Sequence, residues 1–340
     1  MNWRFYKGFS IYENGSGPVY ATPHSGPAIE IPTVRDDNSD TVASLCWIKT
    51  GGTLVIGTIT RKRIWGVDYN RDPPPMKLAI SMYPEFVADK NRDKLRAFRD
   101  RYAFVAKSRS DYEERLRIYN SFWSTVGNLG SVIILIHRKF GRIKNYPSVM
   151  DIVTYEGRGV DSATISRVVQ EINQKYGKSL RGLAPYYKRF VMTETLRVVS
   201  RIERIFGGFG LENLEAEYKV WLKQDLSVIE RLADPEVVQQ LKQKFNKRNF
   251  LAAVRNVLSK KIPPVVTIEN FFKGRKALSM KSKFFNRHFL IMEAEVNAFL
   301  GCWHPHLAAN IITDIVNMLR GAKLYKHLGI RQTRMADFMT

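Results

Sequence analysis

Two short apolar runs, separated by a long helical stretch, constrain the fold of this chain most. The first run covers residues 53–60 (TLVIGTIT) and the second covers residues 130–137 (GSVIILIH). Continuous β-rich runs of this length are typical of strands that are buried on both faces of a sheet. Between them, residues 89–127 place mixed charges on one helical face and apolar residues on the other, which predicts a helix. The strand–helix–strand order predicts an α/β fold, with a mixed or parallel sheet covered by helices.

Shorter segments extend this pattern on both sides. Apolar or β-rich runs predict further strands at residues 18–22, 265–269 and 289–296. Helices are predicted at residues 41–49, with Asp40 as the N-cap, and at 162–176 and 307–319. We therefore expect a mixed central sheet flanked by helices.

Residues 180–261 differ in composition from the rest of the chain. Glycine is nearly confined to Gly182 and the run at 207–210, helix formers dominate, and Lys and Arg outnumber Asp and Glu. This predicts a basic helical insertion at residues 180–261. The α/β core would then consist of residues 1–179 and 262–321, followed by a basic C-terminal tail at 322–340.

The positive charge narrows the class of partner. The 340 residues include 54 Lys and Arg against 32 Asp and Glu, which gives a formal net charge of +22. This balance favours anionic partners, namely a small acidic substrate, nucleic acid or an anionic surface. The hydrophobic content of 44% and aromatic content of 12% are those of a globular protein, not of a disordered one.

The cysteines and the hydropathy of the chain indicate where in the cell the protein is expected. The two cysteines, Cys46 and Cys302, form no C-x-x-C pattern, which argues against a cysteine zinc site and a disulfide framework. The N-terminal residues lack a secretory apolar core, and the best apolar run, at 131–136, is too short to span a bilayer. We therefore expect a soluble cytoplasmic protein without a membrane partner.

Two of the six histidines follow predicted strands, where open α/β sheets place their functional sites. His24 comes after the strand at 18–22, and His137 ends the run at 130–137. An acidic run lies shortly after His24, at residues 35–40. A catalytic zinc takes three nitrogen or oxygen ligands and keeps one open position. His24, His137 and either Asp37 or Asp40 would supply such a set.

Two glutamates interrupt the apolar run at 289–296. Strand alternation places Glu293 and Glu295 on the same face. A buried carboxylate without a partner is costly. Either this face is solvated or ion-paired, or one of the two glutamates is a general base with a raised pKa.

The turn at residues 67–74 (VDYNRDPP) is the third candidate element. Its prolines stiffen the backbone and prevent a helix from starting there. Arg71 offers a planar fork of donors that suits a carboxylate, and Asn70 offers both a donor and an acceptor. A solvated turn is the plain interpretation, and a carboxylate-binding turn is the functional one.

Taken in order, these motifs resemble those of the N-formylglutamate amidohydrolase family. That family typically reads P-H-S-G, D-x-N-R-D, an apolar strand ending in His, F-x-G-G and Q-L-E-I-N. The corresponding segments here are PHSG at 23–26, the acidic run ending at Asp40, GVDYNRD at 66–72, the strand ending in His137, FFKG at 271–274 and EVN at 295–297. The resemblance covers the chain outside the helical segment and implies a carboxypeptidase-like, phosphorylase/hydrolase-like α/β core.

The resemblance also implies a bound metal. It assigns zinc to His24, an acidic residue and His137. Asp40 is the preferred acidic ligand, and Asp37 and Glu30 are the alternatives.

The resemblance further implies a zinc-dependent amidohydrolase that cleaves N-formyl or N-acyl amino acids or a related carboxylate-bearing substrate. Asn70 and Arg71 would bind the substrate carboxylate. Arg63 would polarise the scissile carbonyl, and Glu295 would be the general base.

Two other classes of function remain open from the sequence. The charge and the basic insertion favour a nucleic-acid-binding or interaction protein built on an inactive hydrolase-like core, and we expect such nucleic-acid binding to be non-specific and salt-dependent. A helical interaction protein with a structural core is the third alternative.

Overall fold

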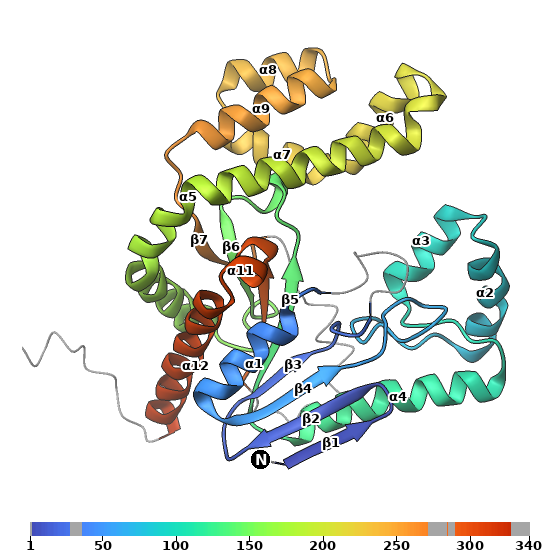
Figure 1. Ribbon diagram of the computed structural model, residues 1–340, viewed down its shortest axis with the longest axis vertical. Coiled ribbons are helices and arrows are strands. Elements are labelled where there is room, and N and C mark those ends of the chain that lie inside the picture. Colours follow the sequence, from blue (N-terminus) through green and yellow to red (C-terminus); the bar gives the residue numbers. More distant parts are fainter. Residues whose placement is uncertain (1, 28–35, 271–283, 285–289, 328–340) are drawn as a thin grey trace, which may run out of the picture.

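The computed structural model describes residues 2–27, 36–270, 284 and 290–327. The protein is a mixed α/β fold built on an eight-stranded sheet (Figure 1). This confirms the predicted class, in which a mixed central sheet is flanked by helices and joined to an additional helical region.

The strands follow one another along the chain with helices between most of them. Their bounds are β1 (Asn2–Tyr6), β2 (Phe9–Asn14), β3 (Val19–Thr22), β4 (Gly52–Gly57), β5 (Val132–Lys139), β6 (Ser148–Val153), β7 (Val265–Ile268) and β8 (Leu290–Asn297).

The helices fall into those that cover the sheet and those that extend from it. In chain order they are α1 (Ser39–Thr50), α2 (Met76–Ala88), α3 (Arg92–Arg101), α4 (Arg109–Asn128), η2 (Ile143–Asn145), α5 (Ser162–Phe206), η3 (Gly207–Phe209), α6 (Leu211–Trp221), α7 (Lys223–Leu232), α8 (Pro235–Gln243), α9 (Lys247–Ser259), α11 (Ala298–Trp303) and α12 (Pro305–His327).

The sheet order is β1-β2-β4-β3-β5-β8-β6-β7. Within the central run β4-β3-β5-β8, each strand is parallel to the next, and β6 is parallel to β7. Antiparallel pairing joins β1 to β2, β2 to β4 and β6 to β8. The carboxyl ends of β3 and β5 therefore lie side by side, which is where an α/β sheet places its functional groups.

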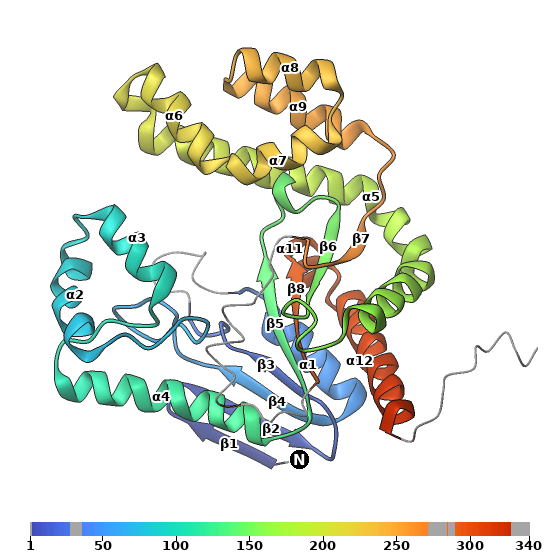
Figure 2. The same ribbon diagram turned by 180° about the vertical axis from the view of Figure 1, so that it is seen from behind.

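Each face of the sheet is covered by a different set of helices. Ile134 and Ile136 of β5 belong to the cluster formed with α1, α5 and α12, whereas Ile133 and Leu135 pack with aromatic residues of α4. Figures 1 and 2 show α1 and α4 on opposite sides of the sheet. Because residues of a strand alternate between faces, His137 projects to the α4 face and Arg138 to the α1 and α5 face.

The helix predicted at residues 89–127 is two helices, α3 and α4. The chain between them is held extended because Tyr102 forms a β-bridge with Asp72, and the Asp68 N–H donates to the Ala103 carbonyl. Ser108 then starts α4 by accepting a hydrogen bond from the Asp111 N–H at 3.2 Å. A contact with a distant turn therefore overrides the local helical pattern.

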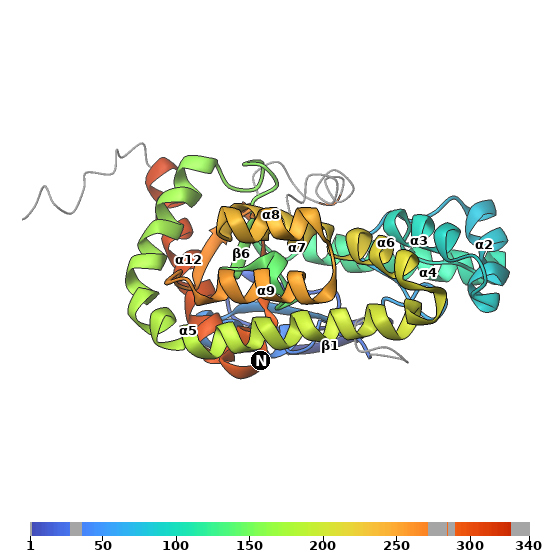
Figure 3. The same ribbon diagram turned by 90° about the horizontal axis from the view of Figure 1, so that it is seen from above.

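The helical region begins inside a single helix. Helix α5 runs unbroken from Ser162 to Phe206, so the boundary expected at residue 180 does not separate two elements. Its first half packs on the sheet through residues such as Ile165 and Ile172, and its second half continues into the region of α6 to α9. Figure 3 shows α9 lying alongside α5.

Other differences concern ends of elements. Strand β5 does not end at His137 but continues to Lys139. Asn38, not Asp40, occupies the N-cap position of α1, with φ of 62°. Helix α12 continues to His327, beyond the expected start of a tail at 322.

Some predicted features lie outside the described residues, namely Glu30, the FFKG motif at 271–274 and most of the C-terminal tail. Among the described helices, none combines the length and the apolar character that crossing a membrane requires.

Candidate metal centre

His24 lies in the turn that follows β3. Its side chain is buried, with 4% of its surface exposed. The turn packs tightly against the chain after β4, because a Cβ atom at Gly26 would lie 2.1 Å from the Ile59 carbonyl oxygen. Only glycine allows this approach, and this explains structurally why Gly26 is the fourth residue of the PHSG motif.

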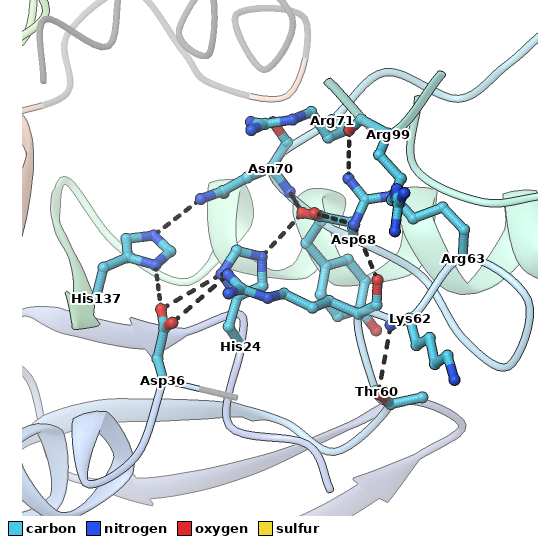
Figure 4. A network of polar contacts seen from close by, with 12 residues as sticks. His24, Asp36, Thr60, Lys62, Arg63, Asp68, Asn70, Arg71, Arg99 and His137 are labelled. Atoms are coloured by element: carbon cyan, nitrogen blue, oxygen red, sulfur yellow. Dashed lines mark hydrogen bonds and ion pairs between the residues drawn. The ribbon is translucent and has the colours of Figure 1, made fainter. Parts of the chain in front are cut away.

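His137 and Asp36 complete a compact group with His24 (Figure 4). The His137 Nδ1 atom lies 3.0 Å from Asp36 Oδ2, and the His24 Nδ1 atom lies 3.4 Å from the same oxygen. All three side chains are buried, and one ligand atom from each lies within 4.8 Å of the others. Two imidazole nitrogens and one carboxylate oxygen form a donor set that suits zinc.

The acidic member of this group is Asp36, not the expected Asp40. The Asp36 N–H donates to the His24 carbonyl at 2.9 Å, which holds Asp36 beside the histidine. The left-handed backbone at Asn38 then turns the chain into α1. Asp40 lies in the first turn of that helix and accepts from the Thr41 N–H, and Asp37 pairs with Arg138 at 2.6 Å.

Asp68 orients His24 from the opposite side of the ring. Its Oδ1 atom lies 2.9 Å from His24 Nε2. A proton on Nε2 that is donated to Asp68 leaves the Nδ1 lone pair facing Asp36, the arrangement of a carboxylate–histidine–metal unit. Burial opposes the ionisation of Asp68, but the nearby Arg63 and His24 hold the pKa of its carboxyl well below the usual range.

Arg63 supports the centre and does not face it. Its Nη1 atom lies 2.7 Å from Asp68 Oδ2, and its guanidinium donates to the carbonyls of Tyr102, Arg61 and Arg99. These bonds occupy its donors around a buried carboxylate. The structure therefore does not bring Arg63 to the position expected for polarising a substrate carbonyl.

Arg61, and not Arg63, is the arginine that lies beside His24 and Asp36. Its Nη1 atom lies 3.2 Å from His24 Nδ1 and 3.5 Å from Asp36 Oδ1. The side chain is partly exposed, at 24%. A cationic group thus lies against the same atoms that a bound metal would contact.

Asn70 and Arg71 make different contacts at the centre. The Asn70 side-chain nitrogen lies 3.2 Å from His137 Nε2, so Asn70 orients the second histidine. Arg71 donates from Nη1 to the Asn70 carbonyl, while its Nε atom is buried without a hydrogen-bond partner among the described residues. The guanidinium of Arg71 is therefore held beside Asn70 by this one hydrogen bond.

Glu295 lies on the sheet beside His137. The two residues pair directly across β5 and β8, so their side chains share the α4 face of the sheet. Burial raises the pKa of the Glu295 carboxyl to about 8, opposed by His137 and Lys139 and increased by Glu293 and Asp36. Glu293, on the same face, accepts a hydrogen bond from the Tyr155 hydroxyl at 3.0 Å.

Lys139 is the buried cation on this face. It donates to the Ser148 hydroxyl, and Ser148 is linked through Thr267 to Asp151. Burial lowers the pKa of the Lys139 ammonium to about 8, against the opposing charges of Asp151 and Glu295. Glu295 therefore has a basic neighbour that its own segment of sequence does not reveal.

Comparison of the chain with protein-family models, curated proteins and solved structures finds no match.

Sequence reasoning missed three residues of the centre: Asp36, Asp68 and Arg61. A signal existed for Asp68, because an Asp two positions before Asn70 forms a turn in which its Oδ1 accepts from the Asn70 N–H at 3.0 Å. Asp36 could not be separated from its acidic neighbours, since its place depends on a backbone contact with residue 24. No pattern distinguished Arg61 from Arg63.

Proposed function

We propose that the protein is a metal-dependent hydrolase that cleaves an amide bond in a substrate bearing a free carboxylate. The single observation that carries this proposal is the buried group of His24, Asp36 and His137, with its ligand atoms within 4.8 Å of one another. Asp68 accepts from the His24 ring, as partners of metal-binding histidines do, and Asn70 fixes the orientation of the His137 ring through its side-chain amide.

Zinc fits this donor set better than calcium or magnesium, since those cations take oxygen ligands. Bound at these three residues, zinc would supply a Lewis acid and a water of lowered pKa. The ligand set leaves a coordination position for that chemistry.

Glu295 is the proposed general base. Its carboxylate accepts a proton from the attacking water and returns it to the leaving amine, so that the proton count balances over the reaction. Its direct pairing with His137 across the sheet supports this role. The hydrogen bond from Tyr155 makes Glu293 the less suitable of the two glutamates.

Arg61 and Arg71 are the proposed cationic groups toward the substrate. Arg61 lies at the ligand atoms, where it stabilises negative charge that develops on the carbonyl oxygen. Arg71, whose side chain is half-buried beside Asn70, would bind the substrate carboxylate through its guanidinium. An N-formyl or N-acyl amino acid has both of the groups that these residues address.

The test is an amidase assay with zinc-supplied protein on a panel of N-formyl and N-acetyl amino acids and their C-terminal amides. We expect hydrolysis of the free acids, its loss after chelation and its return with zinc. The Glu295→Gln variant should lower kcat by roughly 10²–10⁴ with unchanged zinc content. Glu293→Gln is the matched control and should retain most activity. Turnover that survives chelation, or a normal kcat in Glu295→Gln, would refute the assignment.

A further inference from the structure

A groove between α5, α11 and the end of β5 is not used by the proposed hydrolase site. Two adjoining hollows of about 830 and 220 Å³ lie along α5, and Glu194 lines both. We call them together the α5 groove. Its floor includes Phe190 and Phe299 in the larger hollow and Val198 in the smaller one.

Exposed aromatic rings line this groove. Trp303 is 68% exposed, Tyr186 is 62% exposed and Phe140 is 43% exposed. They come from α11, α5 and the end of β5, so three separate segments place rings in one groove. Large apolar side chains gathered at one surface are typical of a binding site.

Cationic side chains accompany the rings. The larger hollow is lined by Arg138, Arg189 and Arg197, and the smaller one by Arg142, Lys144 and Arg201. Asp37, Glu194 and Asp225 pair with three of these arginines. Arg189 has no ion-pair partner among the described residues, and Arg201 lies 6.0 Å from the Trp221 ring that it covers. The groove therefore keeps a net positive charge.

The combination of flat rings and guanidinium groups identifies the class of ligand. We propose that the α5 groove binds single-stranded nucleic acid without sequence preference. Cationic grooves that follow the phosphates, with aromatic side chains on which bases stack, are the common means of such binding. An acidic peptide would satisfy the arginines but leave the exposed rings uncovered, and a duplex keeps its bases stacked on one another.

The geometry of α5 sets the extent of the site. Tyr186 and Arg201 lie fifteen positions apart on one helix, a separation of about 22 Å at the usual helical rise. A site of this length accommodates a short strand of about four or more nucleotides. The groove lies on the opposite face of β5 from the metal centre, because Arg138 lines it while His137 faces away.

The test compares two double variants with the same change in net charge. Arg189→Glu with Arg201→Glu reverses charge in the groove, and Arg181→Glu with Arg248→Glu reverses exposed arginines outside it. Binding of a fluorescein-labelled oligothymidylate of about 12 nucleotides is followed by fluorescence anisotropy over a series of salt concentrations. We expect the groove variant to bind at least tenfold more weakly than the control variant, with a log–log salt slope smaller by about 1.4.

A second pair of variants tests stacking. Trp303→Ala should weaken binding roughly tenfold without changing the salt slope. Trp3→Ala removes a ring on β1 that is 60% exposed, and it should leave binding unchanged. Thermal unfolding followed by circular dichroism verifies that all variants are folded. The proposal is overturned by absence of binding in the wild type at low salt, or by equal losses in the two double variants. It is also overturned if Trp303→Ala binds the oligothymidylate as well as the wild type does. Equal binding of polyglutamate and oligothymidylate by the wild type would overturn it too.

Discussion

At the scale of single residues, a backbone contact, and not the order within the acidic run, decides which acidic residue joins the two histidines. Asp36 is held beside His24 by its N–H, whereas Asp40 faces the start of α1. Asp36→Asn keeps the shape but removes the charge, so we expect most of the bound zinc to be lost, with Asp40→Asn as a control that retains it. Elemental analysis after dialysis measures both, and equal zinc contents would contradict the assignment.

Asp68 should act on the metal through His24. Replacing it with Asn removes the carboxylate that holds the Nε2 proton, and such partners typically account for 10–100-fold in metal affinity. We therefore expect roughly that loss in a competition titration against a zinc chelator. The variant should also unfold more easily, because Arg63 keeps a buried charge without its partner. A folded Asp68→Asn protein with unchanged zinc affinity would exclude this role.

Several site residues were predictable because each has a local sequence signal. His24 and His137 follow apolar runs, and Glu295 interrupts one. The partners that orient them were not predictable from spacing, since Asp68 lies 44 positions from His24 and Asp36 lies 101 positions from His137. Such contacts depend on how loops fold over the sheet.

At the scale of elements, α5 joins the sheet to the helical region. Tyr187 is buried and donates from its hydroxyl to the Ser148 carbonyl of β6 at 3.0 Å. Tyr187→Phe leaves that carbonyl without this donor, so we expect the free energy of unfolding to fall by about 1–3 kcal/mol. The neighbouring Tyr186 is 62% exposed, and Tyr186→Phe should change stability by less than about 0.5 kcal/mol. Chemical denaturation of the two variants makes the comparison, and equal effects would argue against this anchor.

Elements with strong local patterns were predicted, and those defined by distant contacts were not. The runs that became β5 and β8 are mainly apolar, although Glu293 and Glu295 interrupt the second, and both strands are buried almost throughout. Strand β1 has only five residues and is exposed at every position, so no apolar run marks it, and Asp151 interrupts the apolar pattern of β6. The division between α3 and α4 depends on the bridge from Tyr102 to Asp72, which no periodicity reports.

At the scale of the whole molecule, the strand order creates the centre. Strands β3, β5 and β8 are neighbours in the sheet although long helices separate them along the chain. This order brings His24, His137 and Glu295 to one region of the sheet. The sequence predicts the strands but not their order, because pairing depends on tertiary packing and not on local propensity.

The central claim is that this region holds a metal, and elemental analysis of the wild-type chain tests it most directly. The protein would be prepared without chelator, supplied with zinc and dialysed against metal-free buffer. We predict about one zinc per chain, as expected for a single three-ligand site, and its loss in folded His24→Ala and His137→Ala variants. A wild-type protein without stoichiometric metal, or variants that retain it, would contradict the account.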